Sequence, residues 1–285
     1  MRSGARRYLR HMALTKGTGP FGDRPGGVFN FDRPDERAVI YWEDFPRRIR
    51  GSFAGEVVVD SRRAKLLHEE RHLPILYFPE DEVRTELLEP TDHRTHCPWK
   101  GDARHWSLVV DGRVSENAAW SYPDPIAGAP PLAGHIAFYW GRVDEWLEED
   151  EPMLAHMRDP YHRVDVLDSS RRVRVEVDGQ VVAETDRPRP LFETGHPTRW
   201  YIPHEDVRHD LLVRSDTRTV CAYKGVASYH SVTKRDGVAD DAGWFYSEPL
   251  RDAERVRDYV CFFNERVDLY VDGELQERPQ TPWSR

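Results

Sequence analysis

Cysteine, basic runs and long apolar stretches are all scarce in this chain of 285 residues. Its cysteines are an odd number at wide spacing (Cys97, Cys221 and Cys261), which argues against a disulfide framework and is typical of a reducing compartment. The net charge is −9, with 50 acidic against 41 basic residues, which argues against nucleic-acid binding and against a polybasic membrane anchor. No stretch approaches the length of a transmembrane helix. We therefore expect a cytoplasmic protein with no nucleic-acid and no membrane partner.

The common signatures of catalysis and of zinc binding are also missing. The sequence has no Walker A glycine loop, no Gly-x-Ser-x-Gly elbow and no His-Glu-x-x-His motif. It has no Cys-x-x-Cys pair of the kind that holds structural zinc. No catalytic residue can therefore be assigned by motif.

What the chain does contain is an internal repeat. Residues 49–148 match residues 173–272 without a gap, at a shift of 124 residues that places Tyr77 opposite Tyr201. Roughly 30 of the 100 pairs are identical, where chance gives about one in fifteen. A repeat of this length indicates two domains with one backbone. The predicted organisation is an N-terminal extension (1–48), a first β domain (49–150), a linker (151–172), and a second β domain with a C-terminal tail (173–285).

Short runs rich in β-branched and aromatic residues predict strands within each copy, for example at 57–59, 76–78, 107–110 and 136–140. Asp-Gly pairs at 111–112, 178–179, 236–237 and 272–273 predict hairpin turns. A helical turn is predicted after Pro79 and after Pro203. Because the long βα alternation of a parallel sheet is absent, each copy is predicted to be a small, mainly β domain of antiparallel strands.

The sequence resembles a bacterial family that is catalogued as domain of unknown function four-two-seven. The resemblance is carried by residues 77–84, 97–101, 116–122 and 137–140, and it covers both copies. It implies a β-tent-type fold, in which two antiparallel sheets meet at an angle, as in B-type methionine sulfoxide reductases and the thalidomide-binding domain of cereblon. The family is also labelled nucleotidyltransferase-like, which implies an enzyme. Many relatives in that fold hold zinc with paired Cys-x-x-Cys motifs, which this chain lacks.

Histidine and cysteine come close together in the first copy, at His93, His96, Cys97 and His105. Such a cluster can bind zinc. Only the cysteine recurs at the matching positions of the second copy, whereas a structural metal would be expected in both. We therefore predict no metal and no cofactor.

A Cys-x-x-Lys-Gly string occurs in both copies, as Cys97 with Lys100 and as Cys221 with Lys224. A nearby ammonium favours the reactive thiolate, so one hypothesis is a nucleophilic or redox cysteine. The alternative is a buried cysteine and a lysine on a turn whose glycine takes a positive φ. In a third interpretation the pair lines a pocket, and the lysine orients an anionic ligand.

Aromatic residues alternate in the strand that follows, as Trp120-x-Tyr122 and Trp244-x-Tyr246. Each pair points to one face of its strand, and forms either a ligand-pocket wall or ordinary core. Just before the first pair stand Glu116 and Asn117, with two aspartates opposite them in the second copy. These polar residues are either an acid or base beside Lys100 or a solvated turn.

Together these patterns predict a tandem β protein that binds a small, anionic or nucleotide-like molecule, with contact between its two copies. The predicted ligand-binding residues are Cys97, Trp99, Lys100, Glu116, Asn117, Trp120, Tyr122, Cys221, Tyr223, Lys224, Trp244 and Tyr246. Two alternatives remain: an enzyme of nucleotidyl transfer or thiol chemistry, and a structural or interaction module.

Overall fold

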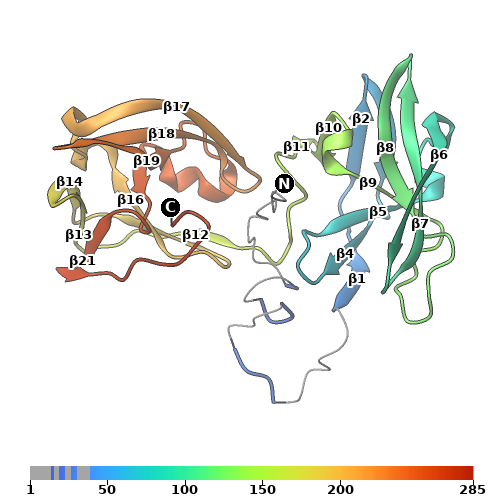
Figure 1. Ribbon diagram of the computed structural model, residues 1–285, viewed down its shortest axis with the longest axis horizontal. Helices are drawn as coiled ribbons and strands as arrows, with labels where there is room; N and C mark the ends of the chain where they lie inside the picture. Colours follow the sequence, from blue (N-terminus) through green and yellow to red (C-terminus); the bar gives the residue numbers. More distant parts are fainter. Residues whose placement is uncertain (1–13, 16–18, 23–26, 31–38, 285) are drawn as a thin grey trace, which may run out of the picture. The chain divides into compact units, whose positions relative to one another are not determined.

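The computed structural model describes residues 14–15, 19–22, 27–30 and 39–284. The described residues up to Asp159 form one compact unit and those from Pro160 form another. Each unit contains one copy of the repeat, drawn mainly in blue to green and in yellow to red in Figure 1.

The first copy consists of two antiparallel sheets. A seven-stranded sheet has the order β1-β4-β5-β9-β8-β7-β6, and a four-stranded sheet has the order β11-β10-β2-β3. The strands are β1 (Ile40–Asp44), β2 (Ile49–Phe53), β3 (Glu56–Ser61), β4 (Lys65–Glu69), β5 (Ile75–Pro79), β6 (Leu88–Cys97), β7 (Gly101–Val110), β8 (Arg113–Ser121), β9 (His135–Phe138), β10 (Glu145–Glu148) and β11 (Glu151–Pro152). Three 3-10 turns join them: η1 (Glu80–Glu82), η2 (Thr85–Leu87) and η3 (Trp140–Arg142).

The second copy repeats this arrangement. Its sheets have the orders β12-β15-β16-β20-β19-β18-β17 and β14-β13-β21-β22. The strands are β12 (Val164–Val166), β13 (Val173–Val177), β14 (Gln180–Thr185), β15 (Arg189–Glu193), β16 (Arg199–Pro203), β17 (Leu212–Cys221), β18 (Gly225–Lys234), β19 (Gly237–Phe245), β20 (Tyr259–Phe262), β21 (Asp268–Val271) and β22 (Glu274–Leu275). The 3-10 elements are η4 (His204–Asp206), η5 (His209–Leu211) and η6 (Arg251–Val256).

The expected mainly β character, with antiparallel strands and little helix, is confirmed. The turns after Pro79 and Pro203 are present as the 3-10 elements η1 and η4. At the hairpin between β7 and β8, Asp111 and Gly112 both have positive φ, 47° and 80°. These are the angles of a two-residue turn that matches the twist of antiparallel strands.

The structural repeat begins earlier than the sequence match. β1, inside the segment expected to be an N-terminal extension, pairs with β4, with Ile40 opposite Glu69. β12, inside the segment expected to be a linker, pairs with β15 in the same register, with Val164 opposite Glu193. β11 also lies in the expected linker. With two and three residues, β11 and β12 are too short to form a recognisable pattern in the sequence.

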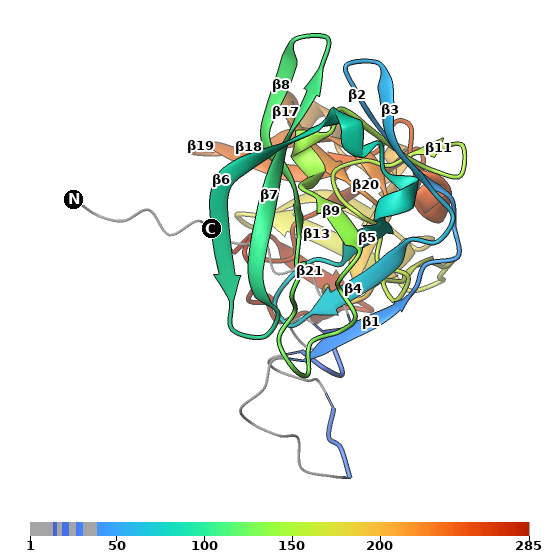
Figure 2. The same cartoon turned by 90° about the vertical axis from the view of Figure 1, so that its right-hand side faces the viewer.

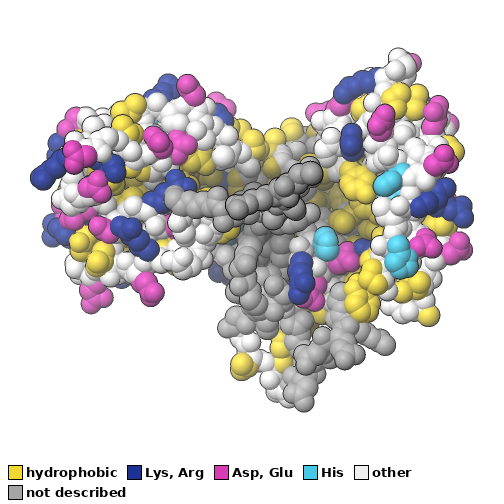
Figure 3. Space-filling view, viewed as in Figure 1, with side chains coloured by type: hydrophobic (Ala, Val, Ile, Leu, Met, Phe, Trp, Pro, Cys, Tyr) yellow, Lys and Arg dark blue, Asp and Glu magenta, His cyan; other side chains and the backbone are white. Residues whose placement is uncertain are grey.

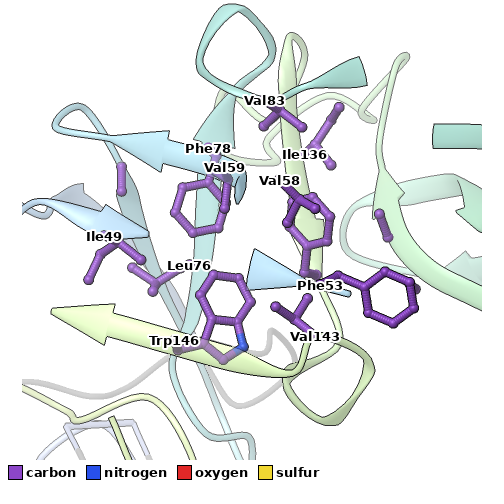
Figure 4. Close-up of a cluster of buried hydrophobic side chains, with 14 of the residues drawn as sticks. Ile49, Phe53, Val58, Val59, Leu76, Phe78, Val83, Ile136, Val143 and Trp146 are labelled. Carbon is purple, nitrogen blue, oxygen red and sulfur yellow. The ribbon is translucent and has the colours of Figure 1, made fainter. Parts of the chain in front are cut away.

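The main core of the first copy lies between its two sheets. In Figure 4 the rings of Phe78 and Trp146 lie among aliphatic side chains from both sheets. These two rings are stacked, with centroids 5.9 Å apart. Gly51 makes room for the indole, because a Cβ at that position would lie 2.7 Å from the ring of Trp146. Burial of each large apolar side chain stabilises the fold by roughly 1.5–3 kcal/mol.

A β-bulge interrupts the pairing of β7 with β8, and Figure 2 shows these long strands curving together with β6. At this bulge Asn117 has a φ of 49°, its N–H donates to Ser107 Oγ at 3.1 Å, and its Oδ1 accepts from Thr91 Oγ1 at 2.7 Å. Asp241 takes the same conformation in the second copy, with a φ of 46°. A bulge raises the local twist, so it helps to curl the large sheet around one of its faces.

The surface of both copies mixes charges of both signs, as Figure 3 shows for one face of the molecule. Among the described residues, no helix is long and apolar enough to cross a membrane.

Candidate functional site

The face of the large sheet turned away from the main core carries a second apolar cluster. In the first copy this cluster includes Tyr77, Trp120 and Tyr122, so Trp120 and Tyr122 do share one face. The indole N–H of Trp120 donates to the hydroxyl of Tyr77 at 3.3 Å. The second copy repeats this bond between Trp244 and Tyr201, at 3.0 Å. Tyr246 belongs to the corresponding cluster there.

The two lysines of the Cys-x-x-Lys-Gly strings are buried in ion pairs with glutamates. The ammonium of Lys100 donates to Glu69, and that of Lys224 donates to Glu193 at 2.5 Å. Glu193 also hydrogen-bonds His162 Nε2 at 3.1 Å. Burial alone would favour the protonated carboxyl, but Lys224 and His162 hold the pKa of Glu193 well below its usual range. Each lysine is therefore paired with a carboxylate of its own copy.

The Cys-x-x-Lys-Gly string forms a tight turn, in which the backbone N–H of Lys100 donates to Cys97 O at 3.2 Å. The glycines that follow the lysines have positive φ, as the plain structural interpretation of this string expects. Cys97 and Cys221 are both half-buried. The aromatic residues inside the turns differ: Trp99 is partly exposed, whereas Tyr223 is buried and stacks on His162 with ring centroids 4.0 Å apart.

The structure does not bring Glu116 and Asn117 beside Lys100. The turn of Lys100 lies at the end of the hairpin where Arg104 pairs with Ser121, whereas Asn117 lies farther along the strand at the bulge, bonded to Ser107. Glu116 is exposed. An acid–base pair of these residues with Lys100 is therefore not formed.

The sequence reasoning missed Glu69 and Glu193, which the structure places against the two lysines. The signal was present, because both are glutamates at matching positions of the repeat. It also missed Tyr77 and Tyr201, which match in the same way and accept the indole hydrogen bonds.

The first copy contains an apolar pocket of about 240 Å³. It opens where the pairing of β5 with β9 ends, beyond the pair Tyr77–Ala137. Of the predicted residues only Trp120 contributes to its wall. The lining residues are Leu73, Pro74, Ile75, Leu76, Phe78, Trp120, Phe138, Tyr139, Trp140, Trp146, His156 and Met157. We call this the slot pocket.

Two aromatic pairs form much of the slot pocket's wall. The rings of Trp120 and Tyr139 have centroids 4.4 Å apart, and those of Trp140 and Trp146 are stacked at 5.1 Å. Behind Tyr139, its hydroxyl lies 3.4 Å from Nε2 of the buried His105. Burial and the nearby His93 lower the pKa of His105, which keeps this imidazole neutral at neutral pH.

In the second copy the equivalent place is filled by an ion pair. Arg199, which matches Ile75, makes two hydrogen bonds of 2.7 Å to Glu265, which matches Gly141. Both side chains are buried. Burial opposes their charges, but the mutual pairing raises the pKa of Arg199 and lowers that of Glu265. Both groups therefore stay charged inside the domain.

The C-terminal tail completes the closure of the second copy. Thr281 Oγ1 donates to Glu265 at 2.6 Å, and Arg266 Nε donates to the backbone carbonyl of Trp283 at 2.9 Å. The indole of Trp283 packs against the guanidinium of Arg199, 5.6 Å from the ring centroid, and near the ring of Phe263. The slot pocket is thus a feature that distinguishes the first copy from the second.

A wider, shallower hollow of about 570 Å³ lies elsewhere on the first copy. Trp99 and Trp42 contribute to it, together with the loop from Ile126 to Pro131. Within the part of the chain that the structure describes, no group of three or more His, Cys, Asp or Glu side chains is arranged to hold a metal ion.

A comparison with curated proteins finds no match to this chain. The family described as "Domain of unknown function (DUF427)" matches twice, over residues 41–149 and 165–273. The two matched segments correspond to the two structural copies and begin within one residue of β1 and β12. With most of its length matched in tandem, the chain belongs to the DUF427 family.

Proposed function

We propose that this protein binds a small molecule and that its binding site is the slot pocket of the first copy. The observation that carries the proposal is the contrast between the copies: one keeps an aromatic-walled pocket of about 240 Å³ where the other places a buried ion pair and its own tail. Protein interiors are normally close-packed, so a gap retained at one of two equivalent positions indicates a use for it.

The walls of the slot pocket define the kind of ligand that fits. Apolar and aromatic residues dominate the lining, which also includes His156. No lysine or arginine is among these described lining residues, so a ligand held mainly by phosphates is disfavoured. Pockets for drug-sized ligands typically span about 300–1,000 Å³, so a smaller molecule is expected here.

The buried lysine pair supports the site from behind. Lys100 and Glu69 neutralise each other on the sheet face that carries Trp120, and Lys100 also lies 5.7 Å from the ring centroid of Tyr122. In this proposal these residues fix the position of the aromatic wall. This differs from the role expected from sequence, in which the lysine itself contacts an anionic ligand.

The test uses indole and cyclohexanol as aromatic and saturated probes, measured by isothermal titration calorimetry on the whole protein. We expect a dissociation constant of about 0.1–1 mM for at least one probe, which is typical of the best small fragments. The double variant Ile75→Arg with Gly141→Glu carries the ion pair of the second copy and should abolish binding. A Cβ at Gly141 would meet no atom within 4 Å, so the glutamate can be accommodated there.

A matched control is Val57→Arg, which adds an arginine at an exposed strand position away from the slot. This variant should bind as the wild type does. If neither probe binds the wild type, or if the double variant binds as tightly as the wild type, the slot pocket is not the binding site.

A further inference from the structure

In the second copy, the C-terminal tail occupies the position of the slot pocket. The groups that the tail places there indicate what kind of ligand the slot pocket can bind. Trp283 presents an indole ring to Phe263 and to the guanidinium of Arg199. Its backbone carbonyl accepts a hydrogen bond from Arg266. A planar bicyclic ring and an oxygen acceptor are therefore held together at one end of the large sheet.

The first copy has corresponding positions for both parts of this occupant. At the shift of 124 residues, Phe263 and Arg199 correspond to Tyr139 and Ile75, which both line the slot pocket. Arg266 corresponds to Arg142, so the donor for the oxygen is the same residue type. Among the described residues, the guanidinium of Arg142 takes part in no ion pair or side-chain hydrogen bond, whereas that of Arg266 is bonded to the tail.

The tail-forming segment of the first copy does not supply an equivalent ring. The matched part of the repeat ends at Glu148 and Asp272, so Trp283 has no aligned counterpart in the first copy. From the segment that follows β11, Met157 lines the slot pocket instead. The thioether of Met157 and the ring of Tyr139 offer polarisable contacts to an aromatic ligand. Tyr139 remains 43% exposed, so its ring is accessible to a ligand.

We infer that the ligand of the first copy is a planar aromatic molecule of about indole size that carries a carboxylate, with its ring in the slot pocket and its carboxylate on Arg142. This inference rests on the proposed function. A carboxylate would make a charge-assisted bond with the guanidinium, which is stronger than the bond that the neutral carbonyl of Trp283 makes with Arg266.

The test compares three probes on the whole protein by isothermal titration calorimetry. Indole-3-acetate carries both features, 3-methylindole lacks the carboxylate, and cyclohexylacetate lacks the aromatic ring. We expect indole-3-acetate to bind about threefold more tightly than either of the others, since Arg142 is exposed and an exposed ion pair contributes about 0–1 kcal/mol. Arg142→Gln should remove the advantage of indole-3-acetate over 3-methylindole and leave the affinity for 3-methylindole unchanged.

Arg104→Gln is the matched control, because it removes the same charge from an exposed position of β7. It should preserve the threefold advantage. Equal affinities for indole-3-acetate and 3-methylindole would overturn the role of the carboxylate. Equal affinities for indole-3-acetate and cyclohexylacetate would show that the ligand need not be aromatic. The proposal that the slot pocket binds a small molecule would remain. The proposed function is tested separately, by indole and cyclohexanol with the double variant Ile75→Arg and Gly141→Glu, so its failure can be told apart from the failure of this inference.

Discussion

The two copies share a backbone and differ at one end of the large sheet. Both keep the buried Lys–Glu pair and the hydrogen bond from tryptophan to tyrosine. They diverge where the first copy has Ile75 and Gly141, and the second has Arg199 and Glu265. These two differences, together with the tail that packs on the second copy, accompany the change from an apolar pocket to a charged interior. The shared features belong to the common fold, and the divergent ones locate the proposed ligand site in the first copy.

The largest expected effect concerns a buried thiol, Cys261, in the second copy, where the first copy has Ala137. Cys261 is fully buried, and burial raises the pKa of its thiol to about 12, whereas Cys97 and Cys221 are half-buried. With a pKa of about 12, roughly one Cys261 thiol in ten thousand is ionised at pH 8. Since only the thiolate reacts, we expect Cys261 to react with iodoacetamide far more slowly than the other two thiols. Mass spectrometry of the labelled peptides measures the three rates.

Urea should remove this difference, because unfolding exposes all three thiols. Comparable rates in the native protein would contradict the burial of Cys261. Its position matches the equally buried Ala137 in the first copy. Ala137→Cys therefore gives each copy a buried thiol that reports its own unfolding.

The next largest effect concerns the ion pair that closes the second copy. Arg199→Ala leaves Glu265 buried without its partner, so we expect it to lower the free energy of unfolding of that copy by about 3–5 kcal/mol. Arg199→Ile with Glu265→Gly, which installs the residues of the first copy, should cost less because no lone charge remains. Labelling of Cys261 as a function of urea concentration measures both.

Arg172→Ala is the matched control for this prediction, because it lies in the same copy. Arg172 pairs with Glu184 at the surface, where such pairs contribute about 0–1 kcal/mol. If Arg199→Ala costs no more than Arg172→Ala, the buried pair does not hold the second copy closed.

The smallest expected effect is a difference in pH dependence. Burial lowers the pKa of His105, so the folded first copy favours the neutral imidazole and loses stability as the pH falls below the unfolded value of about 6.5. His105→Tyr installs the residue of the second copy, Tyr229. Thr95 corresponds to Thr219, the hydroxyl partner of Tyr229, and is available to bond the new hydroxyl.

We therefore expect His105→Tyr to reduce the loss of stability of the first copy between pH 7 and pH 5. Urea titrations that follow a thiol at position 137 measure this loss. Tyr229→His is the reciprocal variant and should add acid sensitivity to the second copy. An unchanged pH dependence in His105→Tyr would show that His105 is not the group responsible.

The sequence predicted the repeat, the β class and the hairpin turns well, because these depend on local patterns. The shared face of Trp120 and Tyr122 also follows from strand alternation. The pairing of Lys100 with Glu69 was not predicted, because it joins a turn to a strand 31 residues away in the sequence. One signal was nevertheless present in the sequence: both copies have a lysine and a glutamate at the same two matching positions, as Lys100 with Glu69 and as Lys224 with Glu193. Two oppositely charged residues that are kept together in both copies are candidates for contact.

The slot pocket could not be predicted from sequence. Its position depends on where the pairing of β5 with β9 ends, which no local pattern reports. Its walls look like ordinary core in the sequence, because Phe78 and Trp146 do belong to the core as well. Asn117 illustrates the opposite error: its polarity suggested chemistry, whereas its backbone conformation accounts for its presence.

The bulges at Asn117 and Asp241 limit which amino acids can replace these two residues. Both positions require a left-handed backbone, which glycine, asparagine and aspartate enter at the least cost. A valine or isoleucine there would favour an extended strand and a flatter sheet. The tolerated residues should thus form the same short list in both copies, even though the copies differ at the slot pocket.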